Sequence, residues 1–466
     1  MKITVVENSK CMESDILVIN LFEGEKTSNE LANTYAIEQD NFKGKFGETY
    51  LLQTYGKEPF RKILVLGLGK KEKLCPNKFR EAVVKAVKKC MQMQAQKIAF
   101  YFEGIDFDYS EQFTTGVYIG DYKFDKYKSE KKDDRIKEIF VQANSDKVAK
   151  AEKIAAAMTF ARNLANEPAQ FATPAELASI ACDFGLDTKV YDIEECEKMG
   201  MGAFVAVGRG SAKPAKFIHM KYTCDNPKKK IAIIGKGLCF DSGGLDLKPA
   251  SSMLTMRDDM SGAAAVLGVM SIIREFHPQV EVHGIIAACE NMPGCDAYKP
   301  GDILTAKNGK TIEVDNTDAE GRLTLADALC YACELNVDEV IDLATLTGAC
   351  VVALGMNASG IMGNDEDLIQ KLIETGKRNG EKMWQLPMWD EYFDSLKSEI
   401  ADMKNTGSRW GGASAAGKFL EKFVKDVKWA HIDIAGTAFL EKPQHEFISG
   451  ATGAGVRTLL NYILEQ

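Results

Sequence analysis

Histidine is scarce in this sequence. Only five histidines occur among 466 residues, and they form neither an HExxH motif nor any close pair along the chain. Zinc sites rich in histidine depend on closely spaced ligands of that kind. The scarcity excludes a histidine-rich zinc site, so any metal ion must be held by carboxylates.

Long apolar runs and excess positive charge are also missing. No stretch approaches the about 18 apolar residues of a membrane span, and the N-terminal MKITVVENSK lacks the order of a signal peptide. We therefore expect a cytoplasmic protein with no membrane partner. The net charge of -9 argues against general attraction to nucleic acid. We interpret the basic segment KFDKYKSEKK (residues 123–132) as a solvated hairpin or loop, with a nucleic-acid contact as the alternative.

The twelve cysteines are scattered singly along the chain, apart from one CxxC pair. This distribution is typical of reduced, partly buried thiols rather than of a disulfide framework. The pair, Cys330 and Cys333, falls inside an apolar helical pattern with no second pair elsewhere. We therefore predict packing rather than metal or redox use for these two thiols.

Apolar runs of strand length alternate with helical stretches in both halves of the chain. This alternation predicts an α/β fold with mostly parallel sheets covered by helices on both faces. Residues 145–166 contain good helix formers and few helix breakers, which predicts one long helix. We expect two α/β domains, residues 1–144 and 167–466, joined by the helix 145–166. The sequence contains no internal repeat and no low-complexity tract.

Polar residues gather where predicted strands end, which is where α/β sheets bind ligands. The strand KKIAIIG runs into a segment that carries Lys236, Asp241 and Lys248, which we place in a glycine-containing loop. Asp259 lies just before or within the first turn of a helix that includes SGAAAVLGVM. The segment VIDLATLTG ends in another small-residue loop, which adds Thr345 to this group. Each residue alone fits a capped turn, a helix N-terminus or an ordinary surface position.

Three more charges follow the predicted strand TIEVDN. Asp318, Glu320 and Arg322 are two residues apart, whereas a surface helix spaces charges three or four apart to share a face. Loop solubility with an internal salt bridge is the simple interpretation. However, the neighbouring residues are small or apolar, and buried carboxylates need a cation to be stable. The coincidence of five ligand-type side chains at strand ends therefore favours a metal site.

The segment NTDAEGRL (residues 316–323) resembles the signature of the leucyl aminopeptidase family, hexameric two-metal exopeptidases also called cytosol aminopeptidases. The resemblance covers residues from about 162 to the C-terminus and is weak over the first 150. It implies a macro-like N-terminal domain and trimers paired into a homohexamer. Further segments are similar to the family's other blocks, in the family's order: GKGLCFDSGGLDLKP, MRDDMSGAAAV, DLATLTGA, WAHIDIAGTAF and GATGAGVRTL.

The resemblance implies a role for each ligand-type residue. Asp241 and Glu320 would bridge two divalent ions, zinc or manganese. Lys236 and Asp259 would complete one site, and Asp318 would complete the other. Four carboxylates then balance two ions, provided that lysine binds as a neutral amine. The aspartate that precedes Asp259 in the chain is the alternative ligand.

Catalytic and substrate-binding roles are implied in the same way. Lys248 would donate to the oxyanion of the tetrahedral intermediate, and Arg322 would hold a bicarbonate ion that shuttles the proton of the attacking water. The pocket for the first side chain would be formed by small and apolar groups. These are Met256, Thr345 and Gly348, with the backbone near Leu346 and the side chain of Asn316 close by.

The function implied by the resemblance is hydrolysis of the N-terminal peptide bond by a two-metal-activated water. The substrates would be peptides with a free α-amino group, with apolar first residues such as leucine preferred. One alternative is a two-metal phosphoesterase, against which the intact NTDAEGRL and Lys248 argue. The other is a DNA-binding regulator on the same scaffold, against which the acidic net charge argues.

Overall fold

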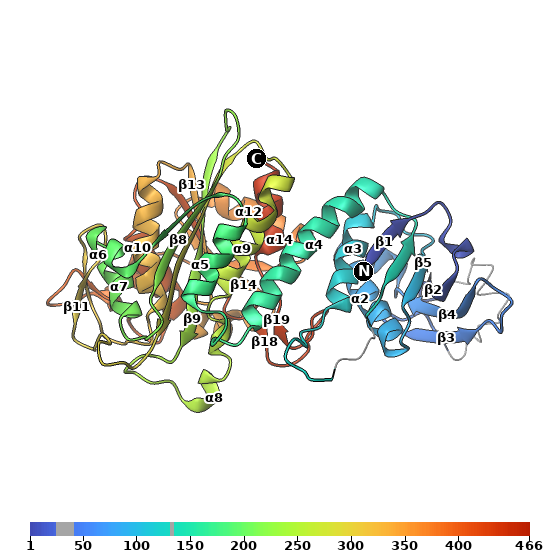
Figure 1. Ribbon diagram of the computed structural model, residues 1–466, viewed down its shortest axis with the longest axis horizontal. Helices are drawn as coiled ribbons and strands as arrows, with labels where there is room; N and C mark the ends of the chain where they lie inside the picture. The colour runs from blue at the N-terminus through green and yellow to red at the C-terminus, as the bar shows by residue number, and fades with distance from the viewer. Residues whose placement is uncertain (25–41, 131–134) are drawn as a thin grey trace. The chain divides into compact units, whose positions relative to one another are not determined.

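The computed structural model describes residues 1–24, 42–130 and 135–466. The chain divides into two compact units (Figure 1). Unit 1 contains Met1–Ala156 with Pro443–Ile448, and unit 2 contains Ala157–Lys442 with Ser449–Gln466. None of the described helices combines the length and the apolarity needed to cross a membrane.

Unit 1 is built on one six-stranded sheet. All neighbouring strands are parallel except β3, which pairs antiparallel with β4. In spatial order the strands are β1 (Lys2–Val5), β6 (Glu138–Val141), β5 (Lys97–Tyr101), β2 (Ser14–Leu21), β4 (Phe60–Gly67) and β3 (Thr49–Gln53). Strand β2 has apolar side chains on both faces, because α2 (Pro76–Gln92) and α3 (Ser110–Asp121) cover one face and a second apolar cluster covers the other.

The predicted long helix is present as α4 (Ser145–Asn166). The division between the two units falls inside it, between Ala156 and Ala157. Of the basic segment 123–132, residues 123–130 contain no helix or strand, as expected for a loop, and residues 131 and 132 lie outside the described residues.

Unit 2 is built on an eight-stranded sheet with a parallel centre. Strands β17, β13, β9 and β10 run parallel, whereas β8, β7 and β14 pair antiparallel with a neighbour. The order is β15 (Met383–Gln385), β14 (Ser359–Gly363), β17 (Lys428–Asp433), β13 (Glu339–Ala344), β9 (Lys230–Asp241), β10 (Glu281–Asn291), β8 (Lys216–Tyr222) and β7 (Asp187–Tyr191). The prediction of an α/β fold with mostly parallel sheets is confirmed.

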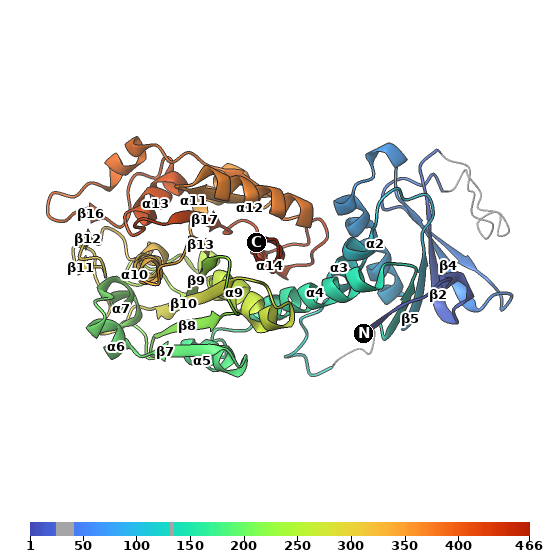
Figure 2. The same ribbon diagram turned by 90° about the horizontal axis from the view of Figure 1, so that it is seen from above.

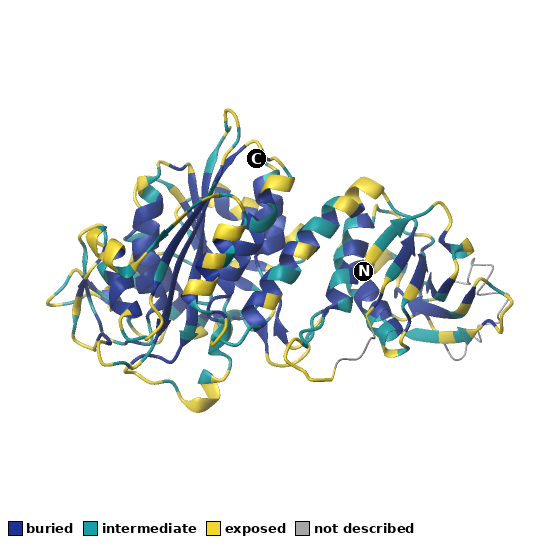
Figure 3. Cartoon of the chain, in the orientation of Figure 1, coloured by how far each residue is buried: buried dark blue, intermediate teal, exposed yellow. Residues whose placement is uncertain are grey.

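Helices cover both faces of this sheet (Figure 2). One face packs on α7 (Gly202–Gly208), α10 (Gly321–Glu334) and α13 (Gly412–Glu421). The other packs on α9 (Ser261–Ile272), which in turn contacts α14 (Val456–Leu464). The central strands are therefore buried along most of their length, while the outer faces of the helices are exposed (Figure 3).

Helix α9 approaches the sheet through two glycines. A Cβ atom at Gly235 would lie 2.5 Å from the carbonyl carbon of Gly262, and a Cβ at Gly262 would lie 2.2 Å from the carbonyl oxygen of Leu343. Real Cβ atoms do not come so close to backbone atoms. The first turn of α9 can rest on β9 and β13 only because both positions lack side chains.

Two expectations about local structure are wrong. Lys236 and Asp241 lie within β9, not in the loop after it, because β10 continues to pair with β9 as far as Asp241, past a bulge at Cys289 and Glu290. In addition, the short strand β12 (Thr311–Glu313) is not part of the main sheet. It pairs with β11 (Ile303–Thr305) and β16 (Met403–Lys404) in a separate three-stranded sheet.

The cysteines behave as expected. All twelve are free thiols. Cys330 is buried in the apolar cluster beneath α10, and its Sγ lies 3.6 Å from the carbonyl oxygen of Phe423. Packing is therefore the role of this thiol, as predicted.

Candidate metal centre

Three buried carboxylates converge at the carboxyl end of β9. Asp241 is the last residue of β9, Asp259 precedes α9, and Glu320 immediately precedes α10. Each offers one oxygen, and these three oxygens lie within 4.8 Å of one another. No other group of three or more histidine, cysteine, aspartate or glutamate side chains converges in this way within the part of the chain that the structure describes.

Lys236 lies among two of these carboxylates. Its Nζ is 2.7 Å from Oδ1 of Asp259 and 2.9 Å from Oε1 of Glu320, and it donates to the carbonyl oxygen of Thr345 at 2.9 Å. Burial by itself would lower the pKa of Lys236, but the neighbouring carboxylates outweigh it and raise the pKa above its usual value. In the protein alone this amine is therefore held as a cation.

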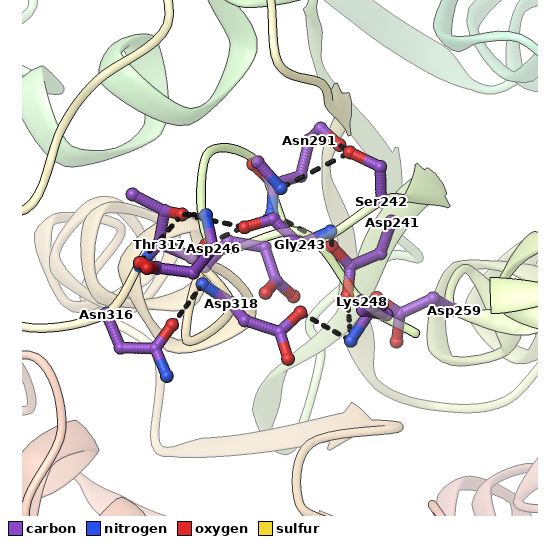
Figure 4. Close-up of polar contacts among 12 residues, drawn as sticks. Asp241, Ser242, Gly243, Asp246, Lys248, Asp259, Asn291, Asn316, Thr317 and Asp318 are labelled. Atoms are coloured by element: carbon purple, nitrogen blue, oxygen red, sulfur yellow. Dashed lines mark hydrogen bonds and ion pairs between the residues drawn. The ribbon is translucent and has the colours of Figure 1, made fainter. Parts of the chain in front are cut away.

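Lys248 lies between the remaining two carboxylates. Its Nζ is 2.8 Å from Oδ2 of Asp241 and 2.5 Å from Oδ1 of Asp318, and Figure 4 shows both carboxylates directed at this lysine. The side chain of Asp318 is about a third exposed, at 32%, whereas Asp241 is buried. Burial lowers the pKa of Lys248, but the carboxylates again outweigh it and raise the pKa.

The centre carries an excess of negative charge, because two lysines face four carboxylates. Burial raises the pKa of both Asp259 and Glu320, and repulsion from Asp241 adds to it. Oδ2 of Asp259 and Oε2 of Glu320 are buried without a hydrogen-bond partner. Buried charged oxygens of this kind need a cation, and carboxylate oxygens bind divalent metal ions. The donor set therefore fits divalent cations.

The buried residue Asn291 fixes the orientation of Asp241. Its Nδ2 donates to Oδ1 of Asp241 at 2.8 Å and to the carbonyl oxygen of Thr317 at 3.0 Å, and the backbone N–H of Gly243 donates to the same Oδ1 at 2.9 Å. Oδ1 is thus engaged, which leaves Oδ2 to face Lys248 (Figure 4). The sequence analysis did not identify Asn291, although a polar residue at the carboxyl end of an apolar strand could have pointed to it.

A second missed residue, Asn405, holds the loop that carries Asp318. Its Oδ1 accepts from the backbone N–H groups of Asp315, at 2.8 Å, and Asn316, at 3.3 Å. Its Nδ2 donates to the carbonyl oxygen of Asn316 at 2.7 Å. Asn405 lies about 90 residues further along the chain, so no local pattern in the sequence pointed to it.

Arg322 lies in the first turn of α10 and is buried. Its Nη1 donates to the carbonyl oxygen of Asn405 at 2.8 Å. Burial lowers the pKa of Arg322 to about 10, and the nearby carboxylates of Glu320 and Asp433 oppose this shift. The guanidinium is therefore still a cation at neutral pH.

The glycine of NTDAEGRL has a steric explanation. A Cβ at Gly321 would lie 2.6 Å from Nζ and 2.4 Å from Cε of Lys236. Any side chain at this position would displace the lysine from Asp259 and Glu320.

Two of the expected pocket residues contact the acidic centre. Oδ1 of Asn316 accepts from the backbone N–H of Asp318 at 2.7 Å. Oγ1 of Thr345 donates to Oδ1 of Asp259 at 2.7 Å. Both side chains therefore help to orient carboxylates of the centre.

The other three expected pocket residues surround this centre less directly. The backbone N–H of Leu346 donates to Oδ1 of Asp433 at 3.2 Å. Gly348 begins α11 (Gly348–Leu354), and a Cβ there would meet no atom within 4 Å. Met256 begins a short 3-10 helix that leads to Asp259 and is half-buried. Asp258, the aspartate that precedes Asp259 and was its alternative as a ligand, lies outside the group of converging carboxylates.

Comparisons with known proteins agree with this geometry. Residues 159–460 match the model of the cytosol aminopeptidase family, catalytic domain, and residues 20–131 match that of its N-terminal domain. A probable cytosol aminopeptidase from Aquifex aeolicus is 46% identical over 452 residues, which covers 94% of this chain and 91% of the relative. One from Persephonella marina is 48% identical over 448 residues, covering 92% and 90%.

Solved structures are similar along almost the whole chain. The bottromycin maturation enzyme BotP in complex with Mn has a TM-score of 0.88 at 31% identity, and the match covers 97% of this chain and 99% of that chain. Together, these matches define the class of the protein as a metal-dependent peptide hydrolase that acts at N-termini, an aminopeptidase. The chain belongs to the cytosol aminopeptidase family.

Proposed function

We propose that this protein is a two-metal aminopeptidase that removes unblocked N-terminal residues from peptides, with apolar residues such as leucine preferred. The observation that carries the proposal is the buried excess of carboxylate at the end of β9, with unpartnered oxygens on Asp259 and Glu320. Binding of Mn by the similar BotP structure supports manganese as one candidate metal, with zinc as the other.

We assign five side chains to two divalent ions. Asp241 and Glu320 would contact both ions, as the family resemblance implies, and both are buried members of the converging group. Lys236 and Asp259, whose Nζ and Oδ1 lie 2.7 Å apart, would complete one site, with Lys236 giving up its proton to the solvent so that it binds as a neutral amine. Asp318 would complete the other site from the more exposed side. Four carboxylates then face two divalent ions, which removes the excess negative charge.

Ions bound here would supply Lewis-acid activation of a water and of the scissile carbonyl, and an anchor for the free amino group. The remaining roles belong to the chain. Lys248 would move from its ion pairs to donate to the oxygen of the scissile carbonyl, where negative charge develops during attack. Arg322 would hold a bicarbonate ion that accepts the proton of the attacking water, because its guanidinium is buried and cationic.

The preference for apolar first residues would come from the surroundings of the centre. Gly348 presents open space where a side chain would stand, and Met256 is half-buried; both would line the proposed pocket. Asn316, Thr345 and Leu346 would complete this pocket. We further propose that the protein works in the cytoplasm as a homohexamer, which the mass of the purified protein in solution would test.

A pair of peptides tests the proposed activity. Leu-Gly-Gly and its N-acetylated twin differ only in the free amino group, which the proposed mechanism requires. With Mn²⁺ or Zn²⁺ added back after chelation, the free peptide should be cleaved and the acetylated one should not. Equal cleavage of both peptides would refute the exopeptidase proposal. A parallel phosphoester panel should show no turnover.

A further inference from the structure

We propose that Asn405 is a positioning residue that fixes the geometry of the metal-binding loop and of Arg322. This inference rests on the proposed metal centre but concerns a residue that would touch neither metal nor substrate. Asn405 has no exposed surface and comes directly after β16. Its side chain and its backbone reach two different parts of the NTDAEGR segment.

The small three-stranded sheet brings Asn405 to this place. Strand β16 pairs in parallel with β12, and the backbone N–H of Asn405 continues the ladder by donating to the carbonyl oxygen of Glu313 at 2.9 Å. The β12 strand ends there, and the loop to Asp318 begins. Pairing of β12 with β16 therefore places Asn405 beside the residues that lead into the metal centre.

The side-chain amide of Asn405 both accepts and donates hydrogen bonds. The oxygen accepts from the backbone N–H groups of Asp315 and Asn316, and the nitrogen donates to the carbonyl oxygens of Asn316, at 2.7 Å, and Ala319, at 3.4 Å. These bonds fix the backbone on both sides of Asp318 and up to the residue before Glu320. A side chain without both a donor and an acceptor cannot replace them.

The backbone carbonyl of Asn405 adds a second link, because it accepts the bond from Nη1 of Arg322 at 2.8 Å. Asn405 therefore positions both the loop that carries the proposed ligands Asp318 and Glu320 and the arginine that would bind bicarbonate. Outer partners of metal ligands typically contribute about 10- to 100-fold to metal affinity or activity. Removal of the Asn405 amide should weaken metal binding by a similar factor.

The experiment compares Asn405→Ala with Asn461→Ala as a matched control. Asn461 is also a buried asparagine of unit 2, and its Nδ2 donates to Oδ1 of Asn379 and to the carbonyl oxygen of Arg457, each at 2.9 Å. Both variants lose buried hydrogen bonds, but only the first loses bonds to the metal-binding loop. Each protein is first freed of metal with a chelator, which is then removed, and binding of Mn²⁺ alone is measured by calorimetric titration. The values of kcat and KM are measured at saturating Mn²⁺.

Asn405→Ala should weaken Mn²⁺ binding by about 10- to 100-fold and lower kcat more than it changes KM, whereas Asn461→Ala should change both by less than about twofold. The milder Asn405→Ser, which keeps a hydroxyl group, should fall between Asn405→Ala and the unmodified protein. It provides the same comparison if Asn405→Ala does not fold.

Two results would overturn the proposal. In the first, the Asn405 variants keep Mn²⁺ affinity and kcat within about twofold of the unmodified protein. In the second, their losses equal those of the Asn461 control. The Mn²⁺ titration does not depend on peptide cleavage. An unmodified protein that binds Mn²⁺ but cleaves no peptide therefore refutes only the proposed function. One that binds no Mn²⁺ removes the metal centre and the role of Asn405 together.

Discussion

Two buried polar networks lie at opposite ends of β10 in unit 2, and they differ in how their charges are satisfied. The candidate metal centre lies at the carboxyl end, where Asn291 contacts Asp241. A histidine network lies toward the amino end, where β10 begins with Glu281 and continues to His283. Both networks contain carboxylates and cations in an otherwise apolar environment.

The histidine network is a continuous line of hydrogen bonds from Tyr331 to Glu281. Oη of Tyr331 lies 2.9 Å from Nδ1 of His219, Nε2 of His219 lies 2.8 Å from Nδ1 of His283, and Nε2 of His283 lies 3.0 Å from Oε1 of Glu281. Lys221 adds an ion pair of 2.9 Å to Glu281. Each ring nitrogen thus has a partner, and the carboxylate has a cation.

The contrast suggests how a functional cluster differs from a structural one. In the candidate metal centre the pKa of Glu320 is raised by burial and by Asp241. In the histidine network, burial alone would raise the pKa of Glu281, but hydrogen bonds from Lys221, His283 and Thr223 outweigh it and lower the pKa to about 2. Glu281 is stabilised by the protein itself, whereas Glu320 keeps a raised pKa and a buried oxygen without a hydrogen-bond partner, for which we propose a metal ion.

The strongest test of this contrast removes one carboxylate from each network. Glu320→Ala should abolish tight metal binding and lower kcat/KM by on the order of 10³-fold or more, because several kcal/mol of transition-state stabilisation depend on the ions. Glu281→Ala should retain metal and activity but lower stability, since it leaves His283 and Lys221 without their partner. Metal analysis, kinetics and urea unfolding of both variants provide the comparison. If Glu320→Ala keeps its metal, the ligand assignment is wrong.

Replacement of the two lysines of the candidate metal centre should affect catalysis and metal binding differently. Lys248→Ala should lower kcat by about 10²- to 10³-fold with metal content intact, the pattern of an interaction made mainly in the transition state. Lys236→Ala should instead weaken metal binding, so that part of its activity returns at high metal concentration. Steady-state kinetics and metal stoichiometry on both variants check this. A near-normal kcat for Lys248→Ala would remove that lysine from the mechanism.

The histidine network should make stability depend on pH. Burial lowers the pKa of His219 to about 4, whereas an unfolded histidine titrates near its usual 6.5. Between these values the unfolded chain binds more protons than the folded one, so stability falls as pH falls through 6.5 toward 4. His219→Gln should reduce this slope by up to about 1.4 kcal/mol per pH unit. Urea midpoints of both proteins from pH 7 to pH 5 measure the slope, and an unchanged slope would contradict the assignment.

The smallest expected effect is at the end of the histidine chain. Tyr331→Phe removes only the hydroxyl that lies 2.9 Å from Nδ1 of His219. Loss of this hydrogen bond should lower the free energy of unfolding by about 0.5 to 1.5 kcal/mol. Activity per bound metal at pH 7.5 should not change, and a fall in kcat would show that the two networks are coupled.

The fold class could be predicted from the sequence because β9, β10, β13 and β17 are long apolar runs separated by helical patterns. Strands such as β7 and β14 were missed, because they are short or partly exposed and have no distinctive run. The placement of Lys236 in a loop was wrong for a related reason. Pairing with β10 extends β9 through polar and glycine residues, and a neighbouring strand is invisible in a local pattern.

The candidate site was predicted unevenly as well. Asp318, Glu320 and Arg322 stand out because their spacing does not fit a surface helix. Asn405 could not be found in this way, because its importance comes from hydrogen bonds across about 90 residues of chain. Residues that act directly on a ligand leave a pattern in the sequence, while residues that hold them in place need not.

The contact between Gly235 and Gly262 makes the candidate metal centre depend on two positions that carry no side chain. Since a single added carbon at either position would collide with backbone, the helix α9 would have to move away from the sheet. Asp259, three residues before Gly262, would move with it and lose its 2.7 Å contact with Lys236. Alanine at either glycine should therefore disturb the proposed metal centre, although neither position would touch a metal ion. The two glycines are thus as necessary to the geometry of the proposed metal centre as the side chains that would contact the ions.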